Sequence, residues 1–227
     1  MQIAKATLSY FPLWAKGPAS ALALSHSNIP WSLNIPSDWA TMKPLTQWSK
    51  LPILEITPSS GSSYKIGHEF AVLSHIGTLD PSLNPTPTDT VISNQLMCES
   101  DDIYAKLTKF QPTPKQREKC SPAELAALWT PSPEMNVHNR EQGLHANLRL
   151  LDEFAASESS SPGSITTSGT SPGECKLYST LRALAMIDGE VLSSYPALTD
   201  FYSKFGELEQ TRSIVEGKQF HQYFIKP

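Results

Sequence analysis

Hydrophobic and polar positions change their spacing about a third of the way along the chain. In residues 1–78, short β-rich runs stand at 6–11, 31–35, 51–56 and 64–66. Helical spacing appears between the first two runs, at Ala19, Leu22, Ala23 and His26, and a second helix is expected from Glu69 to His75. This order, β-α-β followed by β-β-α, predicts a small sheet layered against helices.

Beyond residue 90 the apolar residues recur at helical spacing throughout. Four stripes carry this pattern, beginning at Ile92, Leu144, Leu177 and Leu198. The intervening residues 79–89, LDPSLNPTPTD, contain three prolines and no periodic apolar positions, which is typical of a linker. We therefore predict an α/β domain at 1–78, a linker at 79–89 and an all-α domain at 90–227.

A serine-rich segment at 157–173 interrupts the helical half. Apart from Glu158 and Ile165 it contains only Ser, Thr, Gly and Pro. Such a composition buries little apolar surface to offset the cost of ordering the backbone, so we expect a mobile loop. The segment runs into Ser171-Pro-Gly-Glu174, the pattern of a capping box that starts a helix.

Charge and composition exclude several classes of function. The 18 basic and 22 acidic residues are scattered, so no basic stripe for nucleic acid is present, and no apolar run reaches the roughly 20 residues of a membrane helix. Cys98, Cys120 and Cys175 are widely spaced and odd in number, which favours a reducing compartment. Without a secretory signal or a histidine pair at metal-ligand spacing, we expect a cytoplasmic protein with no metal.

Four pieces of the first domain carry a resemblance: LSYF at 8–11, DWATMK at 38–43, WSKLPILEI at 48–56 and IGHEFAVLSHIG at 66–77. In order and at close to family spacing, they resemble the N-terminal half of the cytosolic glutathione transferases, most like the sigma class. That family has a thioredoxin-like N-terminal domain followed by a helical-bundle C-terminal domain. The resemblance thus implies the same organisation that the spacing predicts.

The resemblance assigns a catalytic role to Tyr10. This residue falls where the family places a tyrosine whose hydroxyl donates a hydrogen bond to the sulfur of glutathione. A free thiol, with a pKa of about 8.5, is only slightly ionised at neutral pH, and the thiolate is the nucleophile. A donor to the sulfur anion lowers that pKa. The other interpretation of Tyr10 is a tyrosine at a strand end that packs under a helix.

Other positions match the glutathione-binding residues of the family. Trp39 and Lys43 match donors to the glycyl carboxylate, although a packing tryptophan and a solvated charge are the alternatives. Leu51-Pro52 matches the pair that binds the cysteinyl part through its backbone, with the proline cis, and Lys50 stands where many members have glutamine. Asp101 matches an aspartate that reaches the α-amino group across a dimer interface, or is a solvated helix charge.

Two positions depart from the family pattern. His68-Glu69 replaces the Gln-Ser or Glu-Ser pair that binds the γ-glutamyl carboxylate, and a carboxylate at Glu69 repels another anion. Either His68 donates instead, or Glu69 turns outward and leaves backbone N–H groups for the anion. Trp14 stands where sigma enzymes have an arginine near the sulfur, with Lys16 two residues further on.

The resemblance implies a dimeric glutathione transferase of the detoxification type, in which Tyr10 activates glutathione as co-substrate. The partner substrate is a hydrophobic electrophile, or a lipid or dienone that is isomerised. We expect its pocket near Pro12, Leu13, Trp14 and Tyr104. The alternative is a non-catalytic binder of hydrophobic ligands, or an interaction module, whose glutathione site has decayed. The matched residues favour the enzyme, whereas Glu69 favours the alternative.

Overall fold

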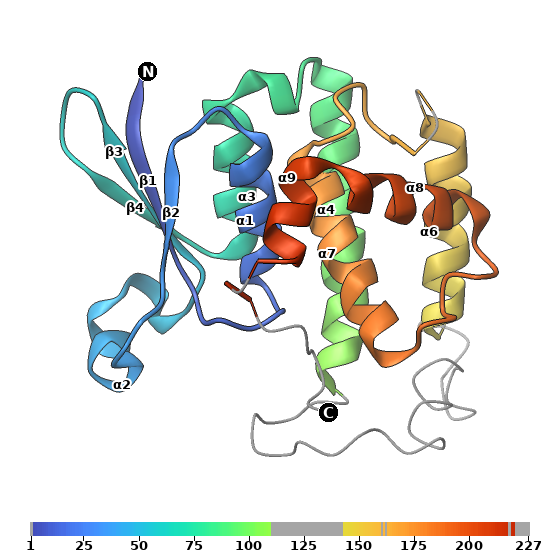
Figure 1. Ribbon diagram of the computed structural model, residues 1–227, viewed down its shortest axis with the longest axis horizontal. Helices are drawn as coiled ribbons and strands as arrows, with labels where there is room; N and C mark the ends of the chain where they lie inside the picture. The colour runs from blue at the N-terminus through green and yellow to red at the C-terminus, as the bar shows by residue number, and fades with distance from the viewer. Residues whose placement is uncertain (1, 110–142, 160, 162, 218, 221–227) are drawn as a thin grey trace, which may run out of the picture.

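The computed structural model describes residues 2–109, 143–159, 161, 163–217 and 219–220. Cys120 lies outside these residues. Figure 1 shows a small sheet at one side of the molecule and a group of helices at the other. No helix of the described residues is long and apolar enough to cross a membrane.

The sheet has four strands in the order β2-β1-β3-β4. Strand β1 (Ile3–Ser9) is parallel to β2 (Trp31–Asn34) and antiparallel to β3 (Ile53–Pro58), which pairs antiparallel with β4 (Tyr64–Gly67). Side chains alternate between the faces of a strand. The cross-strand neighbours Leu8 and Leu54, and Ala6 and Ile56, are fully buried as a result.

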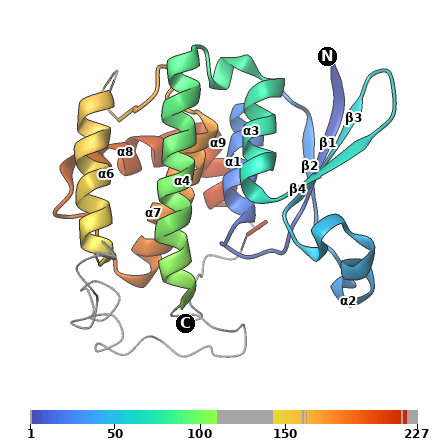
Figure 2. The same ribbon diagram turned by 180° about the vertical axis from the view of Figure 1, so that it is seen from behind.

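Two helices cover one face of this sheet. They are α1 (Gly17–His26) and α3 (Glu69–Leu79), which lie between the strands and the helical half in Figures 1 and 2. A third helix, α2 (Trp39–Met42), is short. Asp38 caps its N-terminus, because the Asp38 carboxylate accepts a hydrogen bond from the Thr41 N–H. Helices α1 and α3 follow the sequence prediction, except that α3 runs four residues further than expected.

The proline-rich segment at 79–89 is more ordered than its composition suggests. It contains a 3-10 turn at Pro81–Leu83, and α4 (Pro87–Lys109) begins within it. Pro81 and Pro87 are the first residues of these elements, a position where the missing N–H costs nothing. Asp80 accepts hydrogen bonds from the N–H and hydroxyl of Ser82 and from the Asn28 N–H.

The second half is helical in the residues that the structure describes. Helices α6 (Leu144–Glu158), α7 (Pro172–Ile187), α8 (Pro196–Glu207) and α9 (Glu209–Val215) follow α4. Helix α7 is central and packs against α1, α3, α4 and α8. Each predicted apolar stripe lies on one of the helices α4, α6, α7 and α8, whereas α9, which packs back on α1, was not predicted.

Two carboxylates hold residues 165–171 of the serine-rich segment, so this part is more ordered than a mobile loop. Glu174 is fully buried and accepts hydrogen bonds from the N–H groups of Ile165 (2.7 Å), Thr166 (3.0 Å) and Ser171 (2.9 Å). Asp89 accepts a further one from the Thr167 N–H at 2.7 Å. The predicted capping box between Ser171 and Glu174 is present. These carboxylates satisfy loop amides that composition alone leaves without partners.

Glu174 is therefore expected to stabilise the loop and the start of α7 together. Glu174→Ala should lower the free energy of unfolding by about 2–3 kcal/mol, because it leaves several buried N–H groups without an acceptor. Urea denaturation measures this value. Glu190→Ala, at an exposed residue, is the control and should change it by less than about 0.5 kcal/mol. Equal effects of the two substitutions would contradict the anchoring role.

Candidate functional site

The ends of three strands meet at one edge of the sheet. Ser9 pairs with Ile53, and Ile53 pairs with Gly67, so these residues lie in one row across β1, β3 and β4. Strands β1 and β4 end at this row and β3 begins there. The register therefore brings together Tyr10, Leu51-Pro52 and His68-Glu69, three of the segments that the sequence singled out.

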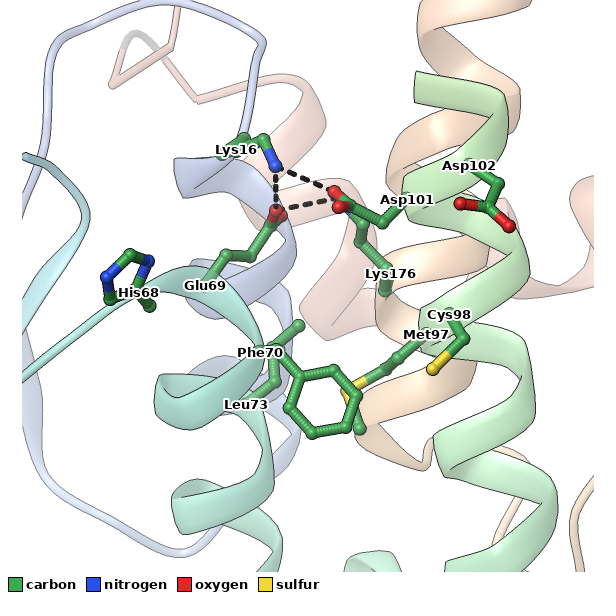
Figure 3. Close-up of a pocket in the computed structure, with 10 residues that line it drawn as sticks. All are labelled: Lys16, His68, Glu69, Phe70, Leu73, Met97, Cys98, Asp101, Asp102 and Lys176. Atoms are coloured by element: carbon green, nitrogen blue, oxygen red, sulfur yellow. Dashed lines mark hydrogen bonds and ion pairs between the residues drawn. The ribbon is translucent and has the colours of Figure 1, made fainter. Parts of the chain in front are cut away.

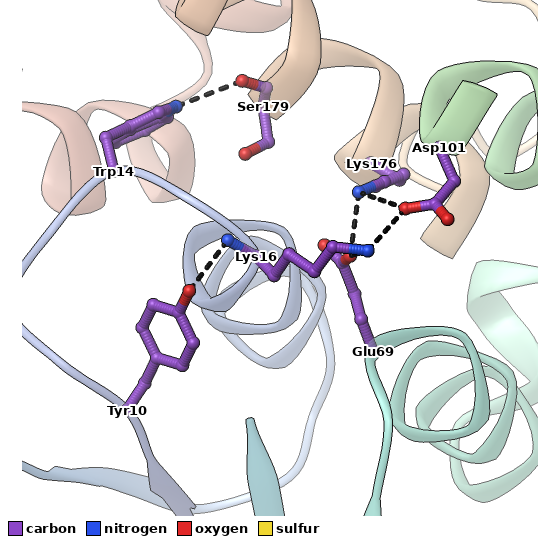
Figure 4. Close-up of polar contacts among 7 residues, drawn as sticks. All are labelled: Tyr10, Trp14, Lys16, Glu69, Asp101, Lys176 and Ser179. Atoms are coloured by element: carbon purple, nitrogen blue, oxygen red, sulfur yellow. Dashed lines mark hydrogen bonds and ion pairs between the residues drawn. The ribbon is translucent and has the colours of Figure 1, made fainter. Parts of the chain in front are cut away.

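Tyr10 follows β1 and is held by its own chain. Its side chain is buried, and its hydroxyl oxygen accepts a hydrogen bond from the Lys16 N–H at 2.9 Å (Figure 4). A tyrosine hydroxyl has one O–H hydrogen in addition to its lone pairs, so this contact leaves the hydrogen free for another acceptor. Burial raises the pKa of Tyr10 above its ordinary value, against the effect of the Lys16 N–H. The phenol of Tyr10 therefore stays neutral and keeps its O–H hydrogen.

The ring of Tyr10 packs against Gly17, the first residue of α1. A Cβ atom at Gly17 would overlap the ring atoms of Tyr10. The absent side chain lets the ring lie under the helix while the hydroxyl reaches the residue before it. The packing interpretation of Tyr10 is thus confirmed, whereas its role as a donor to the sulfur of glutathione stays a prediction.

The segment before β3 contributes the Leu51-Pro52 bond. This peptide bond is cis, as the resemblance implies. Pro52 is buried, Leu51 is half-buried and Lys50 is exposed. Trp48 and Ser49, just before them, have positive φ values of 65° and 49°, a region that few residues other than glycine adopt.

Helix α2, which contains Trp39, lies near one end of the sheet (Figure 1). The indole of Trp39 stands edge-on to Phe11, with 5.8 Å between the ring centroids, so it lies beside the residue that follows Tyr10. Lys43 is exposed in the turn that continues α2. The predicted contacts of Trp39 and Lys43 with the glycyl carboxylate stay predictions.

Glu69 turns inward, which neither interpretation of the sequence anticipated. The first residue of α3, it is 7% exposed, and its Oε2 lies 2.8 Å from Lys176 Nζ and 3.7 Å from Lys16 Nζ. Burial raises the pKa of Glu69, and the two lysines oppose that rise. His68 is exposed instead, with its ring centroid 5.7 Å from that of Trp48.

Lys16, Glu69, Asp101 and Lys176 form a four-charge cluster (Figure 4). Lys16 Nζ lies 2.7 Å from Asp101 Oδ1, and Lys176 Nζ lies 3.6 Å from the same oxygen. Burial raises the pKa of Asp101, but the hydrogen bond and charge of Lys16 hold it below its ordinary value overall. The cluster ties α1 and α3 to α4 and α7 and contains two charges of each sign.

Asp101 contacts Lys16 of its own chain, and its side chain remains 52% exposed. Its predicted contact with a ligand of a partner subunit stays a prediction. Both lysine ammonium groups also lie over the ring of the buried Tyr104, at 5.4 Å for Lys16 and 5.0 Å for Lys176. Cations favour such positions over an aromatic face.

Trp14 points into the helical half. Its ring is 1% exposed, and its Nε1 donates a hydrogen bond to the Ser179 carbonyl at 3.0 Å. The Arg182 guanidinium lies 5.0 Å above the ring. Trp14 therefore anchors the segment after β1 to α7, where it cannot line an open pocket.

A cavity of about 300 Å³ opens beside the four-charge cluster (Figure 3). Its walls come from the loop before α1 and from α3, α4 and α7. Phe70, Leu73 and Met97 give it an apolar side, and the charged groups give it a polar one. No group of three or more His, Cys, Asp or Glu residues that could hold a metal occurs in the described part of the chain.

Solved structures with the same arrangement identify the fold. No family model and no curated protein sequence matches the chain. The glutathione S-transferase of Ascaris lumbricoides superposes with a TM-score of 0.76 at 18% identity, covering 96% of this chain and 100% of that one. The sigma class transferase of Fasciola hepatica gives 0.72 at 16%, covering 96% and 99%.

The chain has the glutathione transferase fold. This confirms, at the level of fold, the resemblance found in the sequence and the predicted thioredoxin-like and helical parts. A third structure, prostaglandin synthase D of Nilaparvata lugens, gives a TM-score of 0.66 at 14% identity, covering 94% of this chain and 98% of that one. The exact domain limits and the roles of the site residues stay predictions.

Sequence reasoning missed Lys176 and Gly17 in this glutathione transferase fold. Lys176 lies next to Leu177 of the apolar stripe, and its neighbours one and two turns on, Thr180 and Ala183, are small and buried. A lysine followed by small uncharged residues at helical spacing is the one signal of its burial. Gly17 left no signal, because its function depends on a ring seven residues away.

Gly17 offers a test of how tightly Tyr10 is held. Gly17→Ala should lower the free energy of unfolding by about 1–3 kcal/mol, because the added methyl group forces the ring and α1 apart. Gly189→Ala, where an added Cβ meets no atom within 4 Å, is the matched control and should have a small effect. Chemical denaturation of both variants gives the comparison. A tolerated Gly17→Ala would mean that the Tyr10 ring is free to move.

Proposed function

We propose that this protein is a glutathione transferase that activates the thiol of glutathione through Tyr10. The observation that carries the proposal is the hydroxyl of Tyr10, whose oxygen is fixed by the Lys16 N–H while its own hydrogen remains available. A hydroxyl that already accepts a hydrogen bond from an N–H group donates more strongly. The raised pKa keeps the hydrogen on the oxygen.

The expected effect of this donor is sufficient for activation. A hydrogen bond to an anion contributes about 1.5–3 kcal/mol, equivalent to lowering the thiol pKa by roughly 1–2 units. The thiol proton leaves to solvent, the thiolate forms a C–S bond with the electrophilic carbon, and the bond from that carbon to its leaving group breaks, so that the leaving group departs as an anion with the electron pair. The protein otherwise contributes positioning and a preformed donor for the sulfur.

The remaining matched residues supply the binding contacts in this proposal. Trp39 and Lys43 hold the glycyl carboxylate, Leu51-Pro52 binds the cysteinyl backbone next to Lys50, and Asp101 receives the α-amino group of glutathione bound by the partner subunit of a homodimer. The acceptor is a hydrophobic electrophile in the cytoplasm. Isomerisation by enzyme-bound glutathione is a related reaction, supported by the likeness to the insect prostaglandin synthase.

Tyr10→Phe tests the activation step. We expect the conjugation rate kcat to fall by one to two orders of magnitude, as the loss of about 1.5–3 kcal/mol predicts, with the KM for glutathione nearly unchanged. Steady-state kinetics with a generic aromatic electrophile measures both. Tyr202→Phe, at a half-buried tyrosine of α8, is the control. An unchanged rate would assign thiol activation to another group, such as Ser9.

One observation favours a second candidate, a non-catalytic binder of hydrophobic ligands or an interaction module. The Glu69 carboxylate occupies the position that the family uses to bind the γ-glutamyl carboxylate. If the charged cluster fills that subsite, glutathione does not bind there. The two candidates differ in whether the chain retains glutathione at all.

Retention on immobilised glutathione separates the candidates. The transferase should be retained at low salt, and Lys43→Ala should elute earlier, because the ammonium no longer meets the glycyl carboxylate. Lys5→Ala, at an exposed residue of β1, should elute like the unmodified protein. A protein that flows through at low salt and conjugates no electrophile is the binder.

A further inference from the structure

Lys176 is a buried lysine whose charge is matched by Glu69. Its side chain is 4% exposed, and its ammonium lies 2.8 Å from Glu69 Oε2. Lysine is almost never fully buried without a partner, because its ammonium loses its hydration there. The pair joins α7 to the start of α3 across more than a hundred residues of sequence.

The negative charge of Glu69 is stabilised more by Lys176 than by Lys16. Lys16 is 3.7 Å from Glu69, is 39% exposed, and is closer to Asp101 at 2.7 Å. Among the described residues, the second carboxylate oxygen of Glu69 has no hydrogen-bond partner. Water screens the exposed Lys16 charge more than the buried Lys176 charge. Lys176 is therefore the counter-charge that neutralises Glu69.

The charges that line the cavity come close to balance only with Lys176 present. Its walls contain the cations Lys16 and Lys176 and the anions Glu69, Asp101 and Asp102, an excess of one negative charge. Loss of the Lys176 charge doubles that excess. The co-substrate proposed above, glutathione, has two carboxylates and one ammonium group and is itself an anion at neutral pH.

We propose that Lys176 is a specificity-determining residue, which by pairing with Glu69 lets the anionic end of a thiol bind at the start of α3, beside this cavity. The inference rests on the proposed function for the identity of the thiol. Lys176 does not contact the reacting sulfur in this role. It removes the repulsion that an unpaired Glu69 carboxylate exerts on a negatively charged ligand.

Titration calorimetry with two thiols tests the assignment. One is glutathione, and the other is its diethyl ester, in which both carboxylates are blocked. Lys176→Met should weaken the binding of glutathione at least about tenfold and should not weaken that of the ester, because glutathione is an anion whereas the ester keeps only the ammonium charge. Glu69→Gln combined with Lys176→Met restores the original charge excess and should bring glutathione binding back to within about threefold of the unmodified protein.

The controls separate charge from structure. Lys204→Met removes a lysine paired with Asp200 on the surface of α8 and should leave both dissociation constants unchanged. Should Lys176→Met fail to fold, Glu69→Gln is compared directly with the double variant. Glutathione should then bind more tightly to Glu69→Gln, which keeps the Lys176 cation, whereas the ester, itself a cation, should show no such preference.

Three results would overturn the inference: equal losses for both thiols, an unchanged affinity for glutathione in Lys176→Met, or no binding of glutathione by the unmodified protein. A different result would contradict the proposed function and leave the role of Lys176 intact. If glutathione binding depends on Lys176 as expected, yet Tyr10→Phe conjugates as fast as the unmodified protein, the specificity role stands and the Tyr10 mechanism falls.

Discussion

The ion pair between Glu69 and Lys176 is the contact that the arrangement of the site depends on. It joins the first residue of α3 to the buried face of α7, and so fixes the sheet layer against the helical half. Breaking a buried pair from one side leaves an uncompensated charge, at a cost of about 3–5 kcal/mol. Lys16 adds to the same cluster, and its N–H in turn holds the hydroxyl of Tyr10. Charge pairing and the position of the phenol are thus linked through one residue.

Sheet register supplies the second constraint. Because Ser9, Ile53 and Gly67 lie in one row, residues far apart in sequence must meet at one edge, whatever their side chains. Gly17 then lets the Tyr10 ring approach the helix that starts above this edge. Backbone topology therefore places the groups, and a few close contacts orient them.

The helices and strands followed from local patterns, since burial on one face leaves a period in the sequence. The stripe at Leu177, Leu181 and Leu184 is such a case, and all three residues are fully buried. The inward turn of Glu69 could not be predicted, because the lysine that receives it lies on another helix, more than a hundred residues away in the sequence. The order of the serine-rich segment could not be predicted either, because the acceptors for its amides, Glu174 and Asp89, lie outside the segment.

A buried ion pair is a poor device for stability alone, because two well-packed apolar side chains of similar volume stabilise a core as well or better. A site that had merely lost its ligand would need no lysine opposite Glu69. The presence of Lys176 at 2.8 Å, beside a cavity with carboxylates on its other wall, is better explained if the charge of that cavity matters to what enters it. In the role proposed for Lys176, the departure at Glu69 and the lysine on α7 belong together, because the second offsets the negative charge that the first adds to the site.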